Sequence, residues 1–139
     1  MPQTTIRLGV GAIVLNGANQ ILLGMRNANE NRGQWELLGG LARPDETLEN
    51  AVKRQVMEEA GIEVEPEVIV AHYDRYFDTD TVRNAGFTFR CRLNSGEPHR
   101  TEHNRVTDFQ WVRLEQAFDL DLTPFTRLQL EQYRQWCKL

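Results

Sequence analysis

The chain has 139 residues and a formal net charge of −4, with 40% hydrophobic and 26% charged residues. This length predicts one domain with a real core, spanning residues 1–139. The acidic balance argues against a nucleic-acid backbone as the main partner, because nucleic-acid-binding proteins usually present a basic surface. No stretch is apolar over a membrane-spanning length, so we expect no membrane partner either.

Two features bear on the cellular compartment. The N-terminal segment MPQTTIRLGV lacks the long apolar core of a signal peptide. Cys91 and Cys137 are isolated and have no metal-like spacing, which favours two reduced thiols over a disulfide. Both observations predict a cytoplasmic protein.

The first 38 residues predict a β-hairpin and a short extended segment. Residues 6–15 (IRLGVGAIVL) are apolar, Asn16-Gly17 is a hairpin-type turn, and residues 20–25 form the returning strand. Arg26 ends this strand, and it either faces solvent or reaches a ligand beside the sheet. In the extended segment 35–38 we expect the tryptophan to pack beneath the following loop.

Residues 39–62 (GGLARPDETLENAVKRQVMEEAGI) predict a glycine turn, a polar loop and an amphipathic helix. Asp45 or Thr47 can cap the helix start, and Gly61 is the residue expected just past the last turn. The apolar positions recur at helical spacing: Leu48, Ala51, Val52, Val56 and Ala60.

Two acids in this helix conflict with its local environment. At about 100° per residue, Gln55 and Glu59 fall inside the apolar arc and Glu58 lies just outside it. A carboxylate that points inward must find a partner or become protonated, and acids in the last helical turn oppose the helix dipole. A bound divalent cation would resolve both conflicts. The alternative is a surface helix whose acids pair with Arg54 and Lys53.

The spacing of the fixed residues distinguishes these alternatives. From Gly40 the order is Gly, five residues, Glu46, seven residues, and then RQVMEEAGI. This resembles the signature of the Nudix hydrolases, G-x5-E-x7-R-E-U-x-E-E-x-G-U with U aliphatic, except that Gln55 replaces one Glu. The resemblance implies an α/β fold, an α/β/α sandwich with a mixed β-sheet between helices. It also implies Mg²⁺- or Mn²⁺-assisted cleavage of a nucleoside diphosphate linked to another group.

The resemblance also implies roles for individual residues. Glu58 and Glu59 are the implied metal ligands and catalytic acids, with the carbonyl of Gly40 as a third ligand, and Arg54 orients the acids. Gly39 and Gly40 let the backbone approach the metal and the phosphates closely. Hard oxygen ligands suit Mg²⁺, which binds through a few carboxylates plus substrate phosphates.

Gln55 is the position where the resemblance weakens, because an amide cannot accept a proton. From the sequence, Gln55→Glu is expected to maintain or raise activity. A general base elsewhere in the chain is therefore a stronger hypothesis. Glu102 is the candidate, because it lies in a loop where other Nudix members often carry a further acid. The neighbouring His103 resembles the histidine of the GDP-mannose group, and the alternative is a solvated polar loop.

After the helix, strand segments are predicted over residues 62–64, 67–77 and 81–93, so the first two are interrupted at residues 65 and 66. Base stacking needs flat side chains, so some of the aromatic residues on these strands are expected to line the nucleotide pocket. We assign substrate binding to Arg26, Gly39, Gly40, Tyr76 and Phe87, with Tyr73 and Phe89 as further aromatic candidates.

The C-terminal part predicts a strand near residues 109–112, a short helix over 114–118 and a last helix from Thr123-Pro124. The apolar faces of the last helix dock against the sheet or a second subunit, so a homodimer is one expected assembly.

Three functions are compatible with these features. The main hypothesis is a hydrolase that releases a nucleoside monophosphate from a nucleoside or deoxynucleoside triphosphate. The second is a hydrolase of nucleotide sugars of the GDP-mannose type, which Gln55 keeps open. The third is a Nudix-fold sensor that binds a nucleotide but turns it over poorly.

Overall fold

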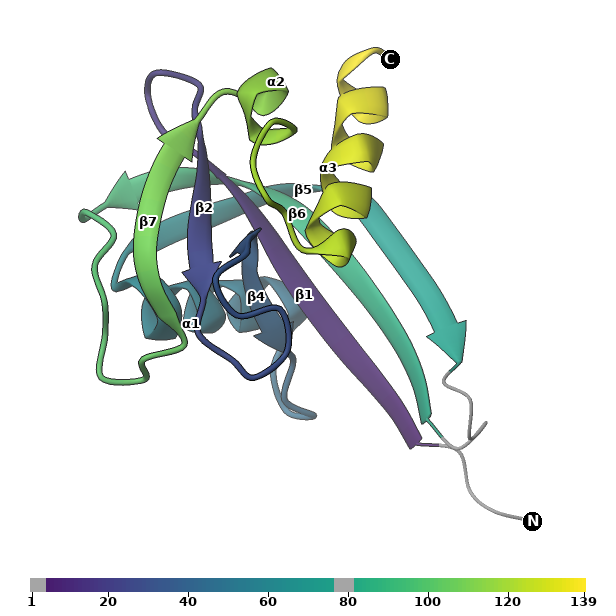
Figure 1. Ribbon diagram of the computed structural model, residues 1–139. Coiled ribbons are helices and arrows are strands. Elements are labelled where there is room, and N and C mark those ends of the chain that lie inside the picture. Colours follow the sequence, from purple (N-terminus) through teal and green to yellow (C-terminus); the bar gives the residue numbers. More distant parts are fainter. Residues whose placement is uncertain (1–4, 77–81) are drawn as a thin grey trace.

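The computed structural model describes residues 5–76 and 82–139, with only the backbone described at residues 75 and 76. Figure 1 shows its helices and strands in chain order. The elements are β1 Thr5–Leu15, β2 Ile21–Arg26, β3 Trp35–Glu36, β4 Leu38–Leu41, α1 Leu48–Ala60, β5 Glu63–Tyr76, β6 Val82–Ser95, β7 Val106–Val112, α2 Leu114–Ala117 and α3 Pro124–Cys137.

The strands of the described part form one mixed sheet in the order β3-β2-β1-β6-β5. Strand β4 pairs with the middle of β1, and β7 pairs with β2. The β1–β6 pair is parallel, and the other pairs are antiparallel. The central position of β1 explains its long apolar sequence, because a strand covered on both faces needs no polar alternation.

The helices cover the two faces of this sheet, with α3 in front and α1 behind in Figure 1. Side chains on a strand alternate between the two faces, and β1 follows this rule: Val10, Ala12 and Val14 join the core beneath α1, and Ile13 joins the core beneath α3. Both cores consist mainly of buried aliphatic residues, with Phe89 and Cys91 in the first and Tyr133 in the second. The predicted α/β/α sandwich with a mixed sheet is therefore confirmed.

Most predicted strand limits agree with the structure to within three residues, and β5 is the main exception. The sequence predicted an interruption near residue 65, but β5 continues through Pro66. The register of β5 against β6 shifts on either side of this proline. Proline lacks an N–H group and is tolerated at such irregularities and on sheet edges, where β5 lies.

Two further expectations concern the cysteines and the membrane. Cys91 is buried and Cys137 is exposed, and both are free thiols. Within residues 5–76 and 82–139, no helix has the length and apolar character needed to cross a membrane.

Candidate active site

Helix α1 begins and ends at capping residues. The Thr47 hydroxyl accepts the backbone N–H of Asn50 at 3.1 Å, so Thr47 rather than Asp45 is the N-cap. Gly61 has φ +70° and donates its N–H to the Met57 carbonyl at 2.9 Å. Glycine adopts this left-handed conformation without the steric penalty of a side chain. These caps place Glu58 and Glu59 in the last turn, as predicted.

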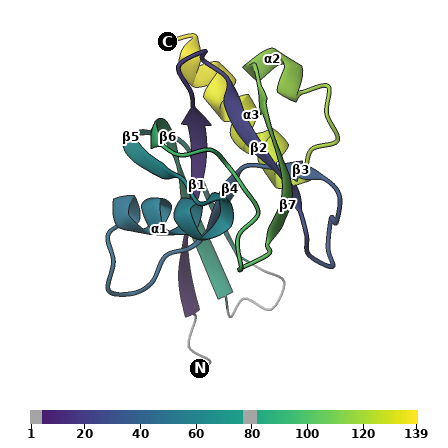
Figure 2. The same ribbon diagram turned by 90° about the vertical axis from the view of Figure 1, so that its left-hand side faces the viewer.

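The connection between β6 and β7 covers the C-terminal end of α1 (Figure 2). The Thr101 hydroxyl donates to the Glu58 carbonyl, and the His99 N–H donates to the Ala60 carbonyl at 3.0 Å. Both acceptors belong to the carbonyl groups that a helix end leaves without intrahelical partners. These bonds therefore reduce the unfavourable dipole that the two acids of the last turn experience.

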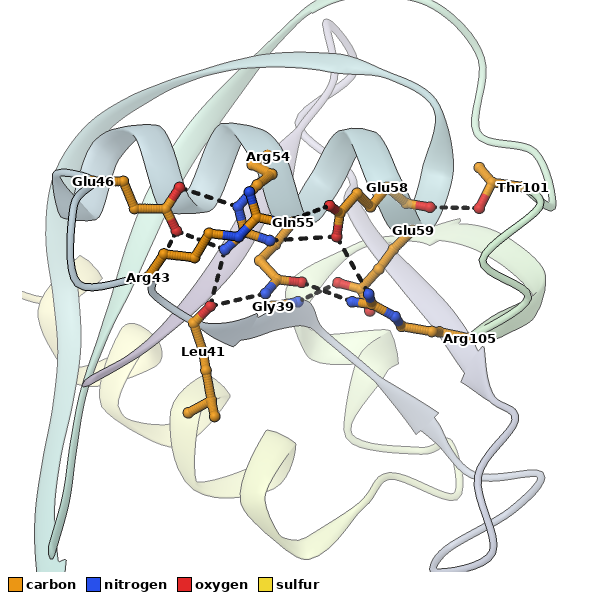
Figure 3. Close-up of polar contacts among 10 residues, drawn as sticks. All are labelled: Gly39, Leu41, Arg43, Glu46, Arg54, Gln55, Glu58, Glu59, Thr101 and Arg105. Atoms are coloured by element: carbon orange, nitrogen blue, oxygen red, sulfur yellow. Dashed lines mark hydrogen bonds and ion pairs between the residues drawn. The ribbon is translucent and has the colours of Figure 1, made fainter. Parts of the chain in front are cut away.

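Glu59 points inward, as the helical wheel predicted, and its residue is only 6% exposed. Its Oε1 accepts the backbone N–H of Gly39 at 2.8 Å (Figure 3). Burial raises the pKa of Glu59 to about 8; nearby Glu36 and Glu58 add to this shift, and the Gly39 bond and Arg105 oppose it. A nearby cation would favour the ionised form of this buried carboxyl.

Glu58 is surrounded by three arginines. Its Oε2 lies 3.3 Å from Nη1 of Arg54 and 3.3 Å from Nη2 of Arg105, and its Oε1 lies 3.8 Å from Nη2 of Arg43 (Figure 3). The predicted pairing of a helix acid with Arg54 is therefore present. Lys53 instead pairs with Glu65 at 3.5 Å, on another side of the helix. Glu58 is thus held at the helix end by opposite charges.

Arg54 fastens the loop before α1 to the helix. It forms a two-bond contact with Glu46, from Nε to Oε2 at 3.0 Å and from Nη2 to Oε1 at 2.6 Å. Its Nη2 also donates to the Leu41 carbonyl at 3.0 Å. The bonds from Arg54, and then the backbone N–H of Arg43, lower the pKa of Glu46 to about 2. Bidentate contacts of this kind fix orientation as well as distance.

The lowered pKa of Glu46 predicts how its contribution to stability depends on pH. The folded pKa of about 2 lies below the ordinary value of 4.5, so the stabilisation is fully present above about pH 4.5 and is lost as pH falls toward about pH 2. We expect Glu46→Gln to lower the melting temperature at about pH 7 and to cost progressively less below about pH 4.5. Melting curves of both proteins across this range check the prediction. A difference that grows on acidification would contradict it.

The polar backbone groups of β4 alternate in direction. Ala42 donates its N–H to the Leu8 carbonyl of β1, whereas Leu41 presents its carbonyl to the α1 side chains Arg54 and Gln55. Gly39 likewise directs its N–H to Glu59. In an antiparallel ladder, successive residues point their polar groups to opposite edges. The backbone groups of Gly39 therefore face α1.

This alternation changes the predicted role of Gly40. Because it lies between Gly39 and Leu41, its backbone polar groups point toward its ladder partner Val10 on β1. The predicted metal-ligating carbonyl of Gly40 is thus directed away from the two acids. We infer that the carbonyl oxygen of Gly39 lies closer to Glu59 than that of Gly40 does. Gly40 instead leaves room for the side chain of Gln55. A Cβ built on Gly40 would lie 2.6 Å from Nε2 of Gln55.

Gly39 tolerates no side chain. Its φ is +156°, and a Cβ built on it would overlap the carbonyl oxygen of Val10. We expect Gly39→Ala to lower the free energy of unfolding by about 2–4 kcal/mol, because the backbone of β1 cannot move aside without breaking the ladder. Urea denaturation measures this change.

Gly17→Ala is the matched control, since a Cβ at Gly17 would meet nothing within 4 Å. Its free energy of unfolding should stay within about 0.5 kcal/mol of the unchanged protein. Equal stabilities of the two alanine variants would contradict the steric account of Gly39.

A cavity of about 400 Å³ opens beside Glu59, whereas Glu58 is not among the residues that line it. Its walls include five of the residues assigned from the sequence: Arg26, Gly39, Gly40, Glu59 and Phe87. It also includes residues that the sequence did not assign, among them Glu36, Arg105, Phe125 and Gln129. The structure thus places the glycines of β4, the acid Glu59 and aromatic side chains around the same cavity.

Arg26 lies in the wall of this cavity and is held in place. Its Nη1 donates to Oε1 of Glu36 at 3.0 Å, and its Nε donates to the Glu30 carbonyl at 2.8 Å. Burial raises the pKa of Glu36, and the charge and hydrogen bond of Arg26 oppose this shift. The sequence signal for Glu36 is an acid within the short apolar segment WELL, which we did not assign to the site.

Part of the cavity wall is aromatic. Tyr73 and Phe87 line it together with Phe125, and the rings of Tyr73 and Phe125 meet edge to face with centroids 4.7 Å apart. Side chains at Gly9 and Gly86 would collide with the Tyr73 ring, so these glycines make room for it. This wall is a flat apolar surface of the kind that a nucleobase needs.

The remaining candidates lie elsewhere. Phe89 is buried in the core beneath α1, and Trp35 packs against the core beneath α3, as expected for a tryptophan beneath the loop. The side chain of Tyr76 lies outside the described residues. Glu102 and His103 are exposed and are not among the residues that line the cavity, although their neighbour Thr101 contacts the end of α1.

The residues present fit a metal ion that binds together with a polyphosphate. Across residues 5–76 and 82–139, no group of three or more His, Cys, Asp or Glu side chains is arranged to hold a metal. The site would instead offer a metal the carboxylates of Glu58 and Glu59 and a backbone oxygen. Mg²⁺ is usually bound through one or two carboxylates, waters and substrate phosphates rather than by an all-protein cage.

Comparison with known proteins identifies the family. The NUDIX domain model matches residues 5–134, so this chain belongs to the Nudix family. A mouse oxidized purine nucleoside triphosphate hydrolase is 31% identical over 121 residues, 87% of this chain and 75% of that protein. The zebrafish protein of the same name is 29% identical over 109 residues, 78% of this chain and 64% of its own length, just under two thirds.

A solved structure supports the same assignment. The MutT Nudix hydrolase from Burkholderia pseudomallei is 30% identical, with a TM-score of 0.75 over 92% of this chain and 98% of that one. The predicted family, fold class and enzyme class, a Nudix pyrophosphohydrolase, are therefore confirmed.

Proposed function

We propose that this protein hydrolyses a purine nucleoside or deoxynucleoside triphosphate to the nucleoside monophosphate, in the cytoplasm and with Mg²⁺ or Mn²⁺. The observation that carries the proposal is the buried carboxyl of Glu59, bound to the Gly39 N–H in the wall of the cavity beside Glu58. The names of the mouse and zebrafish relatives point to oxidized purine nucleoside triphosphates as the first substrates to test.

Different residues of the site bind the metal and the base. Glu58 and Glu59 would hold the metal, and Arg54 keeps Glu58 in place through their 3.3 Å contact. The aromatic wall with Phe87 and Phe125 receives the base, and Arg26 also lines the cavity. A bound divalent metal would neutralise phosphate oxygens and help to activate the attacking water. Water attacks a phosphorus atom of the P–O–P bridge between the α- and β-phosphates, and cleavage of the P–O bond releases nucleoside monophosphate and pyrophosphate.

Two alternatives have less support. Release of a sugar by a GDP-mannose-type reaction depends on a loop histidine, and His103 does not line the cavity. A pure sensor has less need of metal ligands, whereas this chain retains both acids of the signature, Glu58 and Glu59, at the end of α1. The substitution at Gln55 was the reason for both alternatives, and its contacts suggest another role.

A product analysis separates these functions. The purified protein is incubated with Mg²⁺ or Mn²⁺ and a panel of normal and oxidized nucleoside triphosphates, dinucleotides and nucleotide sugars, and the products are resolved by chromatography. We expect nucleoside monophosphate and pyrophosphate, with the highest kcat/KM for a purine nucleoside triphosphate. Release of free sugar would favour the second function. Tight nucleotide binding without turnover would favour the sensor.

A further inference from the structure

Gln55 lies between two partners that fix the orientation of its amide. Its residue is only 5% exposed. Its Nε2 donates to the Leu41 carbonyl at 3.0 Å, and its Oε1 accepts Nη1 of Arg105 at 3.0 Å (Figure 3). A carbonyl can only accept and a guanidinium can only donate, so only one orientation of the amide satisfies both neighbours.

Arg105 is anchored at its backbone and lies in the cavity wall. Its carbonyl accepts the N–H of Asn27 at 3.0 Å, and the next residue, Val106, pairs with Arg26 in the sheet. Its side chain is 46% exposed, and within the described residues its hydrogen bonds go to Gln55 and Glu58. These bonds use two of the five N–H donors of a guanidinium, so donors remain for a ligand.

The other arginine of the cavity wall differs in its partners. Arg26 pairs with the acid Glu36 at 3.0 Å and with a backbone carbonyl, so a negative charge already lies against it. Arg105 has a neutral amide as one partner and shares its other partner, Glu58, with Arg54. The nearest side-chain partner of Arg105 is therefore a neutral amide, whereas that of Arg26 is an acid.

We propose that Arg105 binds a phosphate oxygen of the substrate, and that Gln55 positions Arg105 without neutralising it. This inference rests on the proposed function. A metal bound by Glu58 would compete with the arginines for the Glu58 oxygens, whereas the bond from Arg105 to Gln55 does not depend on Glu58. An arginine with free donors recognises phosphate through short, charge-assisted bonds. Because Gln55 replaces a Glu of the Nudix signature, the positive charge of Arg105 stays available beside the polyphosphate.

The proposal reverses the effect expected from sequence for Gln55→Glu. A carboxylate at position 55 would pair with Arg105 and balance its charge, and it would also face the Leu41 carbonyl that the amide now donates to. We therefore expect Gln55→Glu to weaken phosphate binding. Gln55→Leu removes the hydrogen bonds without adding charge, so it tests the positioning role separately.

The test is calorimetric binding of α,β-methylene-dGTP, which this reaction cannot cleave, with and without Mg²⁺. We expect Arg105→Gln to weaken binding about tenfold or more in both conditions, Arg105→Lys to restore part of the loss, and Gln55→Leu and Gln55→Glu each to weaken it about threefold to tenfold. Arg100→Gln is the matched control, because Arg100 is exposed, bonds to Asn104 and does not line the cavity. It should bind within about twofold of the unchanged protein.

A double variant distinguishes positioning from general damage. If Gln55 acts through Arg105, adding Gln55→Leu to Arg105→Gln causes almost no further loss. Full additivity of the two losses would overturn the positioning role, and binding by Arg105→Gln equal to that of the control would overturn the phosphate role. If the unchanged protein fails to bind the analogue, the triphosphate proposal fails as well. If the unchanged protein and Arg105→Gln bind the analogue equally well, only the phosphate role of Arg105 is contradicted, and the triphosphate proposal stands.

Discussion

Glu59→Gln is expected to lower the metal-dependent kcat by about a thousandfold without unfolding the protein. The change removes the charge that would hold the metal but keeps the size of the side chain, and the amide oxygen can still accept the Gly39 N–H. The carboxyl is buried and its pKa is raised to about 8, so without a metal it is mostly neutral near pH 7, and a neutral amide of the same size replaces it at little cost. The melting temperature should therefore stay nearly equal. Steady-state kinetics with saturating Mg²⁺, together with melting curves, give both values.

Glu49→Gln is the control for this substitution, because Glu49 is an exposed acid in the first turn of the same helix. It makes the same chemical change away from the cavity and should leave kcat within about twofold. If Glu59→Gln had a kcat close to that of Glu49→Gln, the proposed role of Glu59 in metal binding would be contradicted.

Arg54→Met is expected to lower kcat by about a hundredfold and to reduce stability, since the arginine joins Glu46, Glu58 and the Leu41 carbonyl. Its loss leaves Glu46 without its two-bond partner and Glu58 without one of its positive neighbours. Arg54→Lys keeps the charge but cannot form the two-bond contact, so we expect an intermediate kcat. A KM that changes less than kcat would mark Arg54 as a positioning residue.

Lys53→Met provides the comparison for Arg54. Lys53 is adjacent in sequence and also pairs with an acid, but its partner Glu65 lies outside the cavity. Removing an exposed pair of this kind changes stability by at most about 1 kcal/mol, and kcat should not change. If Arg54→Met and Lys53→Met gave the same kcat, the positioning role of Arg54 would be lost.

The parts of the site that depend on local sequence could be predicted. The helix limits at Thr47 and Gly61 follow from capping chemistry, and the inward position of Gln55 and Glu59 follows from helical periodicity. The hairpin and the start of the last helix also follow from short-range patterns. Each of these features is set by residues a few positions apart in the chain.

The missed features depend on contacts between distant segments. Arg105 is fifty residues from Gln55 in the chain, and no local pattern indicates that their side chains meet. Glu36 becomes a cavity residue because β3 pairs with β2 and brings it against Arg26. The direction of the Gly40 carbonyl depends on the register of β4 against β1, which the order of residues in β4 does not specify.

Diffraction from crystals grown with Mn²⁺ and α,β-methylene-dGTP tests the central claim most directly, because anomalous scattering locates manganese independently of the protein atoms. We predict a peak within coordination distance of a carboxylate oxygen of both Glu58 and Glu59, with a phosphate oxygen of the analogue completing the coordination. A manganese peak remote from both glutamates, in crystals of a protein that hydrolyses nucleotides with Mn²⁺, would contradict the account.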